Sequence, residues 1–583
     1  MDTRRLMLLA VFLFSLFMLW DSWQRTQHPP VNTQKVAAQE TTDKHGAVSA
    51  DIPKADGNLR AVGGSGADAA DISEAGEPQT QAESVFVETD LVRAEISARG
   101  GDIVWLGLKR YRAGGDANQD SATNAGENAA EKHEELFALF SDTHSYSAQS
   151  GLIGAQTGAE LPNHKTMLTP LPGKRALSDG EDTLEVRLAA PERGGIRATK
   201  VYTFHRGSYL VDVAWEIENE SGAPLEADAY FQLQRDGKAP EGDSVMLSTF
   251  TGAAVYTDAE KYQKNTFDDI AKGKAKFMKN AADGWLAVVQ HYFVAAWAPE
   301  SGVKREFFMR RLSEARDRNG IFSAGVILPV ERIESGKTGG IRAPLFAGPQ
   351  EQAALKAVAP GLDLVVDYGW LHIIAAPIFW LLGFFNRLLG NWGWSIVALT
   401  VLIKLCFYPL SAASYRSMAR MRLLTPKLTQ IKERCADDRM KMNQEMMRLY
   451  QTEKINPLGG CLPILVQIPV FIALYWVLLS AVEMRGAPWA FWIHDLSASD
   501  PYYVLPTVMM ISMFAQTRLN PTPTDPIQAK MMLIMPLVFG VLFFFFPAGL
   551  VLYWVVNNLL SIAQQWQINR LLEAGGGGKP SGK

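Results

Sequence analysis

Residues 394–409 read Trp394-Ser-Ile-Val-Ala-Leu-Thr-Val-Leu-Ile-Lys404-Leu-Cys-Phe-Tyr-Pro409, an oily stretch that carries one charge, Lys404. Ser395 and Thr400 are its other polar interruptions. Burying an ammonium group in the core of a bilayer costs several kcal/mol unless water or a partner meets it. The sequence therefore predicts a polar site inside a membrane domain.

Further apolar stretches follow Gly369, whereas residues 24–368 have the composition of a water-soluble sequence. At ~1.5 Å per residue, each stretch is long enough to cross ~30 Å of hydrocarbon as a helix. The predicted spans are residues 393–411, 462–482, 502–519, 529–546 and 549–569.

The N-terminus predicts one more span. Met1-Asp-Thr-Arg4-Arg5 precedes an apolar run from Leu6 to Trp20, which is typical of a secretory signal. The next residues are Asp21-Ser-Trp23, without the small residues of a cleavage site, so residues 1–23 are predicted to form an uncleaved signal-anchor helix. Arg4 and Arg5 should hold its N-terminus in the cytoplasm, and the chain then has six spans.

A basic segment fixes the predicted topology. Residues 414–456 contain ten Lys or Arg and five Asp or Glu, a net charge of +5, so the rest of the chain, whose total is -4, sums to -9. Basic loops favour the cytoplasm. This requires the apolar residues 370–385 to lie along the outer interface rather than to span, and residues 369–390 are predicted to be an interfacial amphipathic helix. The loop 483–500 is then external.

The region between the anchor and the first core span divides in two. Residues 24–83 lack aromatic residues after Trp23 and cannot bury enough apolar area to fold, so they are predicted to be a disordered periplasmic tether. Residues 84–368 show apolar residues at every second position between turn signals, which predicts a mostly antiparallel β-sandwich. All three cysteines lie beyond this region, so a disulfide framework in it is excluded.

The basic segment also predicts structure of its own. Thr425-Pro426 fits a helix start, and residues 436–438 fit a turn between two helices, so residues 412–456 are predicted to be a cytoplasmic helical hairpin. Two interpretations stay open: a basic loop that sets topology and touches anionic lipid, or a docking arm for a nascent chain, a ribosome or a targeting factor. The tail, residues 571–583, should also be cytoplasmic.

Several classes of chemistry are disfavoured. The membrane part has no Walker loop, no His/Cys metal cluster and no His-bearing nucleophile constellation, so no catalytic residue, metal or cofactor is predicted and the chain is not expected to be an enzyme. Lys404 itself leaves alternatives. It could snorkel to the cytoplasmic surface, serve as the ion site of a transporter or channel, or pair with a serine in a hydrolase, although no serine stands out.

Other polar residues in the spans favour a hydrated pocket, because polar groups in lipid must face each other or water. The last cluster among them could equally lie near the headgroups. These residues are Thr400, Gln467, Gln516, Thr517, Asn557, Asn558, Ser561, Gln564 and Gln565.

Four stretches of the membrane part stand out as motifs: Asn456-Pro-Leu-Gly-Gly-Cys-Leu-Pro463, Trp492-Ile-His-Asp-Leu-Ser497, Asp500-Pro-Tyr-Tyr503 and Phe546-Pro-Ala-Gly-Leu-Val-Leu-Tyr-Trp554. They resemble the bacterial YidC family of membrane protein insertases, in its Gram-negative form with a large periplasmic domain. The resemblance runs over the whole chain and is most specific within residues 390–570.

The resemblance implies a multi-pass α-helical membrane protein whose five-helix insertase core, residues 391–570, surrounds a positively charged hydrophilic groove. It also implies that the β domain is a supersandwich. In the family the second span carries a groove arginine, and Lys404 falls on that position, so the charge is retained without the bidentate fork of a guanidinium. The candidate groove residues are Lys404, Thr400, Gln467, Tyr553 and Trp554.

The implied function is insertion, folding and assembly of inner-membrane proteins, independently or with the Sec translocon. The implied partners are nascent membrane proteins, the translocon, membrane lipid, and a ribosome or targeting factor bound by the hairpin and tail; no nucleic-acid sequence is expected to be recognised. The candidate docking residues of the hairpin are Arg416, Arg420, Arg422, Lys427, Lys432 and Arg434.

Overall fold

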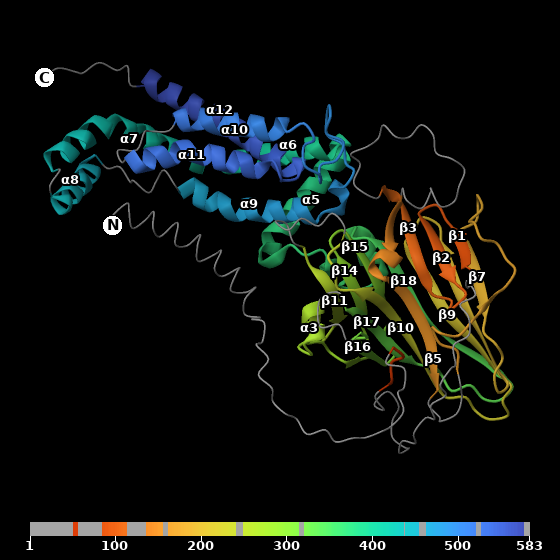
Figure 1. Ribbon diagram of the computed structural model, residues 1–583. Coiled ribbons are helices and arrows are strands. Elements are labelled where there is room, and N and C mark those ends of the chain that lie inside the picture. The colour runs from red at the N-terminus through yellow and green to blue at the C-terminus, as the bar shows by residue number, and fades with distance from the viewer. Residues whose placement is uncertain are drawn as a thin grey trace.

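The computed structural model describes a β part and a helical part of the chain (Figure 1). The predicted anchor and most of the predicted tether lie outside the described residues, as does most of the 456–463 motif. The described residues are 51–55, 84–112, 136–154, 161–240, 249–313, 320–435, 438–453, 462–519 and 526–575.

The β part contains two nine-stranded antiparallel sheets. The first has the order β1-β2-β3-β5-β10-β17-β16-β13, with β4 paired to β3. Its strands are β1 (Ser84–Glu88), β2 (Val92–Ser97), β3 (Ile103–Arg112), β4 (Leu136–Phe140), β5 (Ser147–Gly154), β10 (Ala227–Asp236), β13 (Asn280–Ala281), β16 (Arg305–Arg311) and β17 (Ile321–Pro329).

The second sheet has the order β12-β11-β14-β15-β18-β9-β8-β7-β6. Its strands are β6 (Thr169–Pro170), β7 (Thr183–Ala189), β8 (Ile196–His205), β9 (Leu210–Asn219), β11 (Thr251–Thr257), β12 (Lys261–Thr266), β14 (Trp285–Gln290), β15 (Phe293–Trp297) and β18 (Lys337–Pro349). Short helices η3 (Asp142–His144), α3 (Phe267–Ala271), α4 (Gln352–Val358), η4 (Leu362–Val365) and η5 (Gly369–Leu371) complete the β part and its exit.

The two sheets pack face to face around one apolar core. The rings of Phe231 on β10 and Trp297 on β15 lie 5.2 Å apart, and Trp215 Nε1 on β9 donates to Ser150 Oγ on β5 at 3.2 Å. Burial alternates along β2, as the period-two pattern requires. The predicted mostly antiparallel β-sandwich is confirmed.

One ion pair lies inside this core. Lys200 on β8 is 0% exposed, and its Nζ donates to the Gly100 carbonyl at 2.9 Å and to Asp102 Oδ1 at 3.4 Å. Burial raises the pKa of Asp102 to about 7 and lowers the pKa of Lys200 to about 8. The two sheets therefore enclose a charge pair whose members depend on each other.

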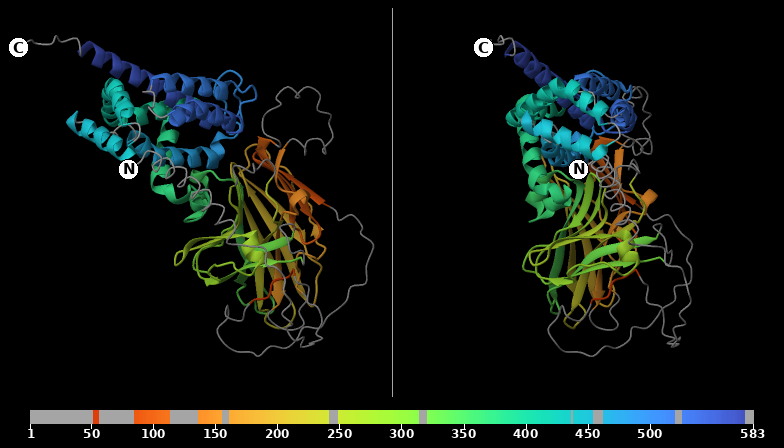
Figure 2. Two further views of the ribbon diagram at one scale, coloured as in Figure 1. Left: turned by 60° about the vertical axis from the view of Figure 1, so that its left-hand side comes forward. Right: turned by 90° about the vertical axis from the view of Figure 1, so that its left-hand side faces the viewer.

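The helical part follows Tyr368. In Figure 1 the axes of α9, α11 and α12 lie roughly parallel, and the views of Figure 2 keep these helices together. Its helices are α5 (His372–Leu389), α6 (Trp392–Cys406), α7 (Tyr408–Arg434), α8 (Arg439–Thr452), α9 (Leu462–Ser480), η7 (Val482–Met484), α10 (Val504–Leu519), α11 (Pro526–Phe543) and α12 (Ala548–Gly575).

The predicted span 393–411 is not one straight helix. The chain bends by 62° between α6 and α7, where Phe407 ends α6. Pro409 explains the break, because its ring clashes with the carbonyl four residues earlier and restricts the residue before it. The hairpin helix α7 therefore leaves the bundle directly beyond Lys404.

The predicted helix start at Thr425 is also wrong, since α7 continues through Pro426. Leu424 and Leu428 are both buried, one on each side of the proline. An internal proline costs about 3 kcal/mol, and burial of two leucines offsets a cost of that size. Helix α7 ends at Arg434 and α8 begins at Arg439, with the Asp438 side chain capping α8; residues 436–437 of the predicted turn lie outside the described residues.

By length and hydropathy alone, one described helix, α5, qualifies as a membrane span. Helix α6 together with the start of α7 would qualify as a second, bent span. The apolar parts of α9 and α11, Val466–Ser480 and Lys530–Phe543, are shorter than such a test requires.

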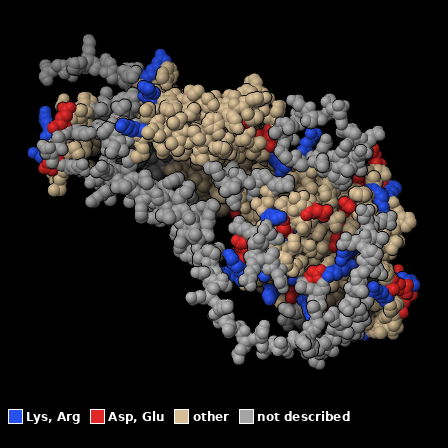
Figure 3. Space-filling view, viewed as in Figure 1, with Lys and Arg blue, Asp and Glu red and all other residues tan. Residues whose placement is uncertain are grey.

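Charge separates the molecule into zones. On the face shown in Figure 3 the helices are almost free of charged side chains, whereas Lys, Arg, Asp and Glu appear over the α7–α8 end and over the β part. The uncharged surface includes exposed apolar side chains of α11: Leu533, Ile534, Leu537, Val538 and Val541. An exposed apolar surface of this kind marks contact with lipid or another apolar partner.

Arg485, directly after η7, joins the two parts. Its guanidinium lies over the rings of Phe137 at 4.7 Å and Phe293 at 5.2 Å, both on the β part. His291, in the turn between β14 and β15, lies 3.1 Å from the carbonyl oxygen of Leu479 near the end of α9. The β part therefore contacts the end of the bundle that contains η7.

Glu483 makes this junction sensitive to pH. Burial raises the pKa of its carboxyl from 4.5 to about 7, and Glu351 adds to the rise. Because the folded state holds the proton more tightly than the unfolded state, junction stability falls as pH rises from about 4.5 to about 7, by up to about 3 kcal/mol. We expect hydrogen exchange of residues 481–485, corrected for intrinsic rates, to become faster across this pH window.

The Glu483→Gln variant should lack this response. Glu218→Gln, on an exposed position of β9, should retain it. Corrected exchange that stays constant across the window in the wild type would contradict the assignment.

Candidate functional site

Lys404 lies in the last turn of α6 and its side chain is directed into the bundle. It is 6% exposed, and its Nζ donates to Ser561 Oγ on α12 at 2.8 Å. No Asp or Glu among the described residues contributes an opposing charge to it. These contacts favour a polar site over snorkelling, which would expose the ammonium at the headgroups.

A layer of polar pairs surrounds this contact. Gln467 Nε2 on α9 donates to Asn557 Oδ1 on α12 at 2.8 Å. Asn558 Nδ2 donates to Ser512 Oγ on α10 at 3.2 Å. Polar groups in apolar surroundings gain most by pairing with one another. Helix α12 therefore supplies polar partners to α6, α9 and α10.

The polar layer lies at one depth in the bundle. Asn391 Nδ2 donates to the Pro488 carbonyl and Ala548 N to the Ala498 carbonyl, so α6 and α12 begin at the η7 end. A helix rises ~1.5 Å per residue, so thirteen residues correspond to ~20 Å. Lys404 follows Asn391 by thirteen residues, and Ser561 follows Ala548 by the same number. Gln467 precedes Ser480 by thirteen residues, so all three side chains lie at the same distance from the η7 end.

The remaining candidate groove residues lie nearby with different contacts. Thr400 is buried, but its hydroxyl donates to Ile396 O within α6 at 2.7 Å and not to Lys404. Tyr553 is buried and interacts with Gln467. The Trp554 ring contacts Phe471 at 4.7 Å between centroids. The structure thus gathers Tyr553 with Gln467 and places Thr400 one helical turn from Lys404.

Sequence reasoning missed two contributors. Ser512 on α10 and Tyr415 on α7 were not among the candidates, yet Ser512 pairs with Asn558 and Tyr415 interacts with Ser561. A lone serine in an apolar stretch was a usable signal for Ser512. No such signal in the sequence pointed to Tyr415, because the bend after α6 is what brings α7 back to Ser561.

Lys404 and Ser561 are the two residue types of a Ser/Lys hydrolase dyad, but their hydrogen bonds differ from those of a dyad. In such a dyad, a neutral lysine accepts the proton of the serine hydroxyl. Here the Ser561 hydroxyl donates to the Asn557 carbonyl at 2.7 Å and accepts from Lys404. This arrangement holds a cation in place and does not prepare a nucleophile.

The candidate docking residues lie on α7. Arg416, Lys427 and Arg434 have exposed side chains. The side chains of Arg420, Arg422 and Lys432 lie outside the described set. Lys427 Nζ forms an ion pair with Glu453 Oε1, just past α8, at 2.7 Å, so it links the two helices of the hairpin.

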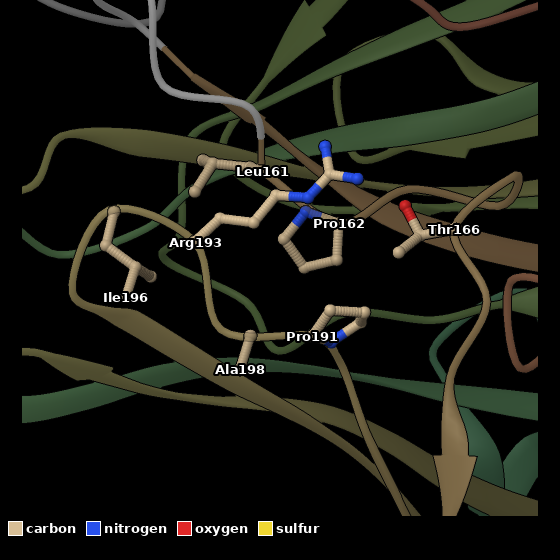
Figure 4. Close-up of a pocket in the computed structure, with 7 residues that line it drawn as sticks. All are labelled: Leu161, Pro162, Thr166, Pro191, Arg193, Ile196 and Ala198. Carbon is tan, nitrogen blue, oxygen red and sulfur yellow. The ribbon is translucent and has the colours of Figure 1, made fainter.

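A small hollow in the β part is shown in Figure 4. It holds about 10 Å³, room for about one water molecule, and Leu161, Pro191 and Arg193 are among its lining residues. Within the described ranges, no group of three or more His, Cys, Asp or Glu side chains could hold a metal ion. The hollow is too small to be a substrate site.

Comparison with known proteins identifies the family. Residues 84–381 match the family model "YidC periplasmic domain", and residues 384–574 match "60Kd inner membrane protein". A Dechloromonas aromatica protein named "Membrane protein insertase YidC" is 55% identical over 99% of this chain and 98% of its own length. An Aromatoleum aromaticum protein of the same name is 53% identical over 100% of both chains.

A solved structure described as "Active YidC insertase crystal structure with the first transmembrane domain resolved" is 19% identical. It covers 83% of this chain and 92% of its own, with a TM-score of 0.38. The family assignment rests on the full-length relatives and on the two models, which together cover the β part and the helical part. The chain belongs to the YidC family of membrane protein insertases, with a periplasmic β domain and a helical membrane core.

Proposed function

We propose that this protein inserts membrane proteins into the inner membrane, the activity for which its relatives are named. The observation that carries the proposal is the buried cation Lys404 within a layer of polar pairs, in a bundle whose outer surface is apolar. A polar layer in lipid lowers the cost of moving a client's polar segment through hydrocarbon. The family is one of insertases, in agreement with the expectation that the chain is not an enzyme.

We propose that the chain has six spans: the anchor (residues 1–23) and the five spans of the membrane core. The core spans are α6 with the start of α7, α9, α10, α11 and α12. The anchor N-terminus and the hairpin, residues 412–456, lie in the cytoplasm. The tether, residues 24–83, and the β domain, residues 84–368, lie in the periplasm. The uncharged zone of Figure 3 between two charged zones supports this orientation of the bundle.

Helix α5 is proposed to lie along the periplasmic interface, although its length and hydropathy would permit a span. Its two ends are tied to the same end of the bundle. Before α5, the Asp367 carbonyl accepts from Ser480 Oγ at 3.2 Å; after it, Asn391 Nδ2 donates to the Trp489 carbonyl at 3.1 Å. A helix crossing the membrane would have its ends at opposite ends of the bundle.

The proposed mechanism uses Lys404 as an attracting charge. A client segment with a short acidic or polar tail enters from the hairpin side, and its polar part occupies the polar layer while its apolar face moves into lipid. Burial of an apolar helix of about 20 residues supplies tens of kcal/mol by area, enough to drive insertion without nucleotide. The protein then lowers a barrier and need not transduce energy.

The hairpin is proposed to receive the client. The exposed cations Arg416 and Arg434 and the bridged Lys427 give its α7 helix a basic surface that suits a nascent chain, a ribosome or a targeting factor. We further propose that the protein cooperates with the Sec translocon and that the hairpin contacts anionic lipid.

Reconstitution of the purified full chain in liposomes tests the function. The client is a single-span peptide with an acidic tail, and the measurement is protease protection of the tail. We expect protection that depends on the protein. Protection no higher than in empty liposomes, with folded protein and soluble client, would contradict independent insertion. Liposomes that also contain the translocon would then test a role that requires it.

A further inference from the structure

A short piece of the tether, residues 51–55, is described and lies on the outer face of the first sheet. In Figure 1 it is the isolated red segment near β10 and β16, and it stays against the sheet in both views of Figure 2. The piece reads Asp51-Ile-Pro-Lys-Ala55, with Pro53 buried and Lys54 exposed. A tether segment too polar to fold alone is therefore held by a surface of the β domain.

The surface beneath it is built from four adjacent strands. Tyr230 on β10 pairs in register with Gly151 on β5 and Ile327 on β17. Tyr230 and Ile327 form a small apolar cluster separate from the main core, and Ile52 and Ala55 pack against it. This cluster forms the floor of the surface: Tyr230 is 0% exposed and Ile327 is 1% exposed, although both point away from the sandwich core.

Glycine keeps this floor open. A Cβ on Gly151 would lie 2.6 Å from the Tyr230 hydroxyl oxygen, and one on Gly325 would lie 2.6 Å from Cζ of Phe308. Both contacts are closer than real Cβ atoms make. Glycine at these two positions therefore leaves room for the rings of Tyr230 and Phe308, which form the apolar floor.

Polar groups around the floor bind both the side chain and the backbone of Asp51. Its carboxylate lies 2.8 Å from Lys165 Nζ and 3.4 Å from His164 Nε2. Arg310 Nη2 donates to the Asp51 carbonyl and, at 3.4 Å, to Gln232 Oε1. Burial lowers the pKa of His164 to about 4, so Lys165 and Arg310 rather than His164 supply the positive charge at neutral pH.

A buried hydrogen-bonded network lies behind Arg310. Gln232 is 0% exposed; its Oε1 accepts from Ser323 Oγ at 2.9 Å, and its Nε2 donates to Gln149 Oε1 at 2.7 Å. Such networks hold a surface residue in one orientation. Arg310 is therefore positioned to bind a peptide carbonyl rather than free to follow solvent.

We propose that the outer face of β5, β10, β17 and β16 is a peptide-binding site whose resident ligand is the chain's own residues 51–55, recognised as an acidic residue followed by an apolar residue and proline. The occupied site divides the tether, so that 27 residues, 24–50, separate the anchor from the β domain instead of 60, residues 24–83. Because the ligand is in the same chain, a free peptide of the same sequence competes with it.

Cysteine labelling of the full chain in proteoliposomes tests this site. Pro53→Cys and Lys54→Cys are adjacent variants, one buried and one exposed, and an impermeant maleimide reports their accessibility. The parent chain, with its three cysteines, gives the background. If nine-tenths of the molecules are docked at equilibrium, Pro53→Cys should react about tenfold more slowly than Lys54→Cys. Ala55→Cys, which keeps the proline, should also react slowly.

Two changes should release the segment: a double substitution at the site and a competing peptide. Asp51→Ala with Arg310→Ala in the Pro53→Cys chain should raise its labelling rate to that of Lys54→Cys. A synthetic peptide of residues 47–58 should do the same, whereas the peptide with alanine in place of Asp51 should not. Equal labelling of all three cysteine variants in folded protein would overturn the proposal. Slow labelling of Pro53→Cys that neither the double substitution nor the peptide changes would also overturn it.

Discussion

Replacing Lys404 with glutamate is expected to lower protein-dependent insertion of an acidic-tailed client at least about tenfold. Two unit charges 4 Å apart interact by about 4 kcal/mol at an effective dielectric constant of 20, and a tenfold change in rate needs about 1.4 kcal/mol. The substitution turns the attraction between Lys404 and the client's carboxylate into repulsion. Even if hydration screens most of this energy, the remainder is enough for a tenfold change in the insertion rate. The measurement is the initial rate of tail protection in proteoliposomes.

Three matched variants separate charge from geometry. Lys404→Arg should keep most of the insertion rate because charge is retained, and Lys404→Gln should fall between the wild type and the glutamate variant. Ser561→Ala, which removes the hydroxyl partner of Lys404, should reduce the rate less than Lys404→Glu. A hydrolase would instead lose activity with both Lys404→Arg and Ser561→Ala. Full insertion by folded Lys404→Glu would refute the role of the charge.

Replacing Lys200 with methionine is expected to destabilise the β domain by about 3–5 kcal/mol, since Asp102 is left as an unpaired buried carboxylate. For a domain of this size, that corresponds to a loss of roughly 10 °C in Tm. Thermal unfolding of the full chain, followed by its β-sheet circular dichroism, measures the loss. Because a lone buried carboxyl takes up a proton, the loss should shrink as pH falls.

The double variant Lys200→Met with Asp102→Leu should recover most of the stability, because it removes both charges together. Arg197→Met is the surface control from the same strand. Arg197 pairs with Glu192 and Glu220 in solvent, and such exposed pairs contribute little. A Tm for Lys200→Met equal to that of Arg197→Met would show that the buried pair is not needed.

The β domain was predictable because its strands obey a local rule. Strands such as Val92–Ser97 alternate apolar and polar residues, and this alternation follows from a sheet with one buried face. The order of strands in the two sheets is set by pairings between residues far apart in the chain. Lys200 stands at a position that the alternation of β8 assigns to the core, yet a lysine on a strand is ordinarily assigned to solvent.

The candidate site was predictable in its composition but not in its pairing. Lys404 and Gln467 stand out because a polar residue in an apolar stretch is expensive. That Lys404 meets Ser561, and Gln467 meets Asn557, depends on how α6, α9 and α12 pack. The break before Pro409 had a sequence signal, yet the apolar residues on both sides favoured a single span.

That break also alters the electrostatics around Lys404. Peptide dipoles align along a helix and leave about half a negative charge at its C-terminal end. Because α6 ends at Cys406, Lys404 lies in its last turn, beside that partial charge. In an unbroken helix the same lysine would lie in the interior, where successive dipoles cancel. Pro409 thus gives the buried ammonium a counter-charge that is made only of backbone and is about half that of a carboxylate.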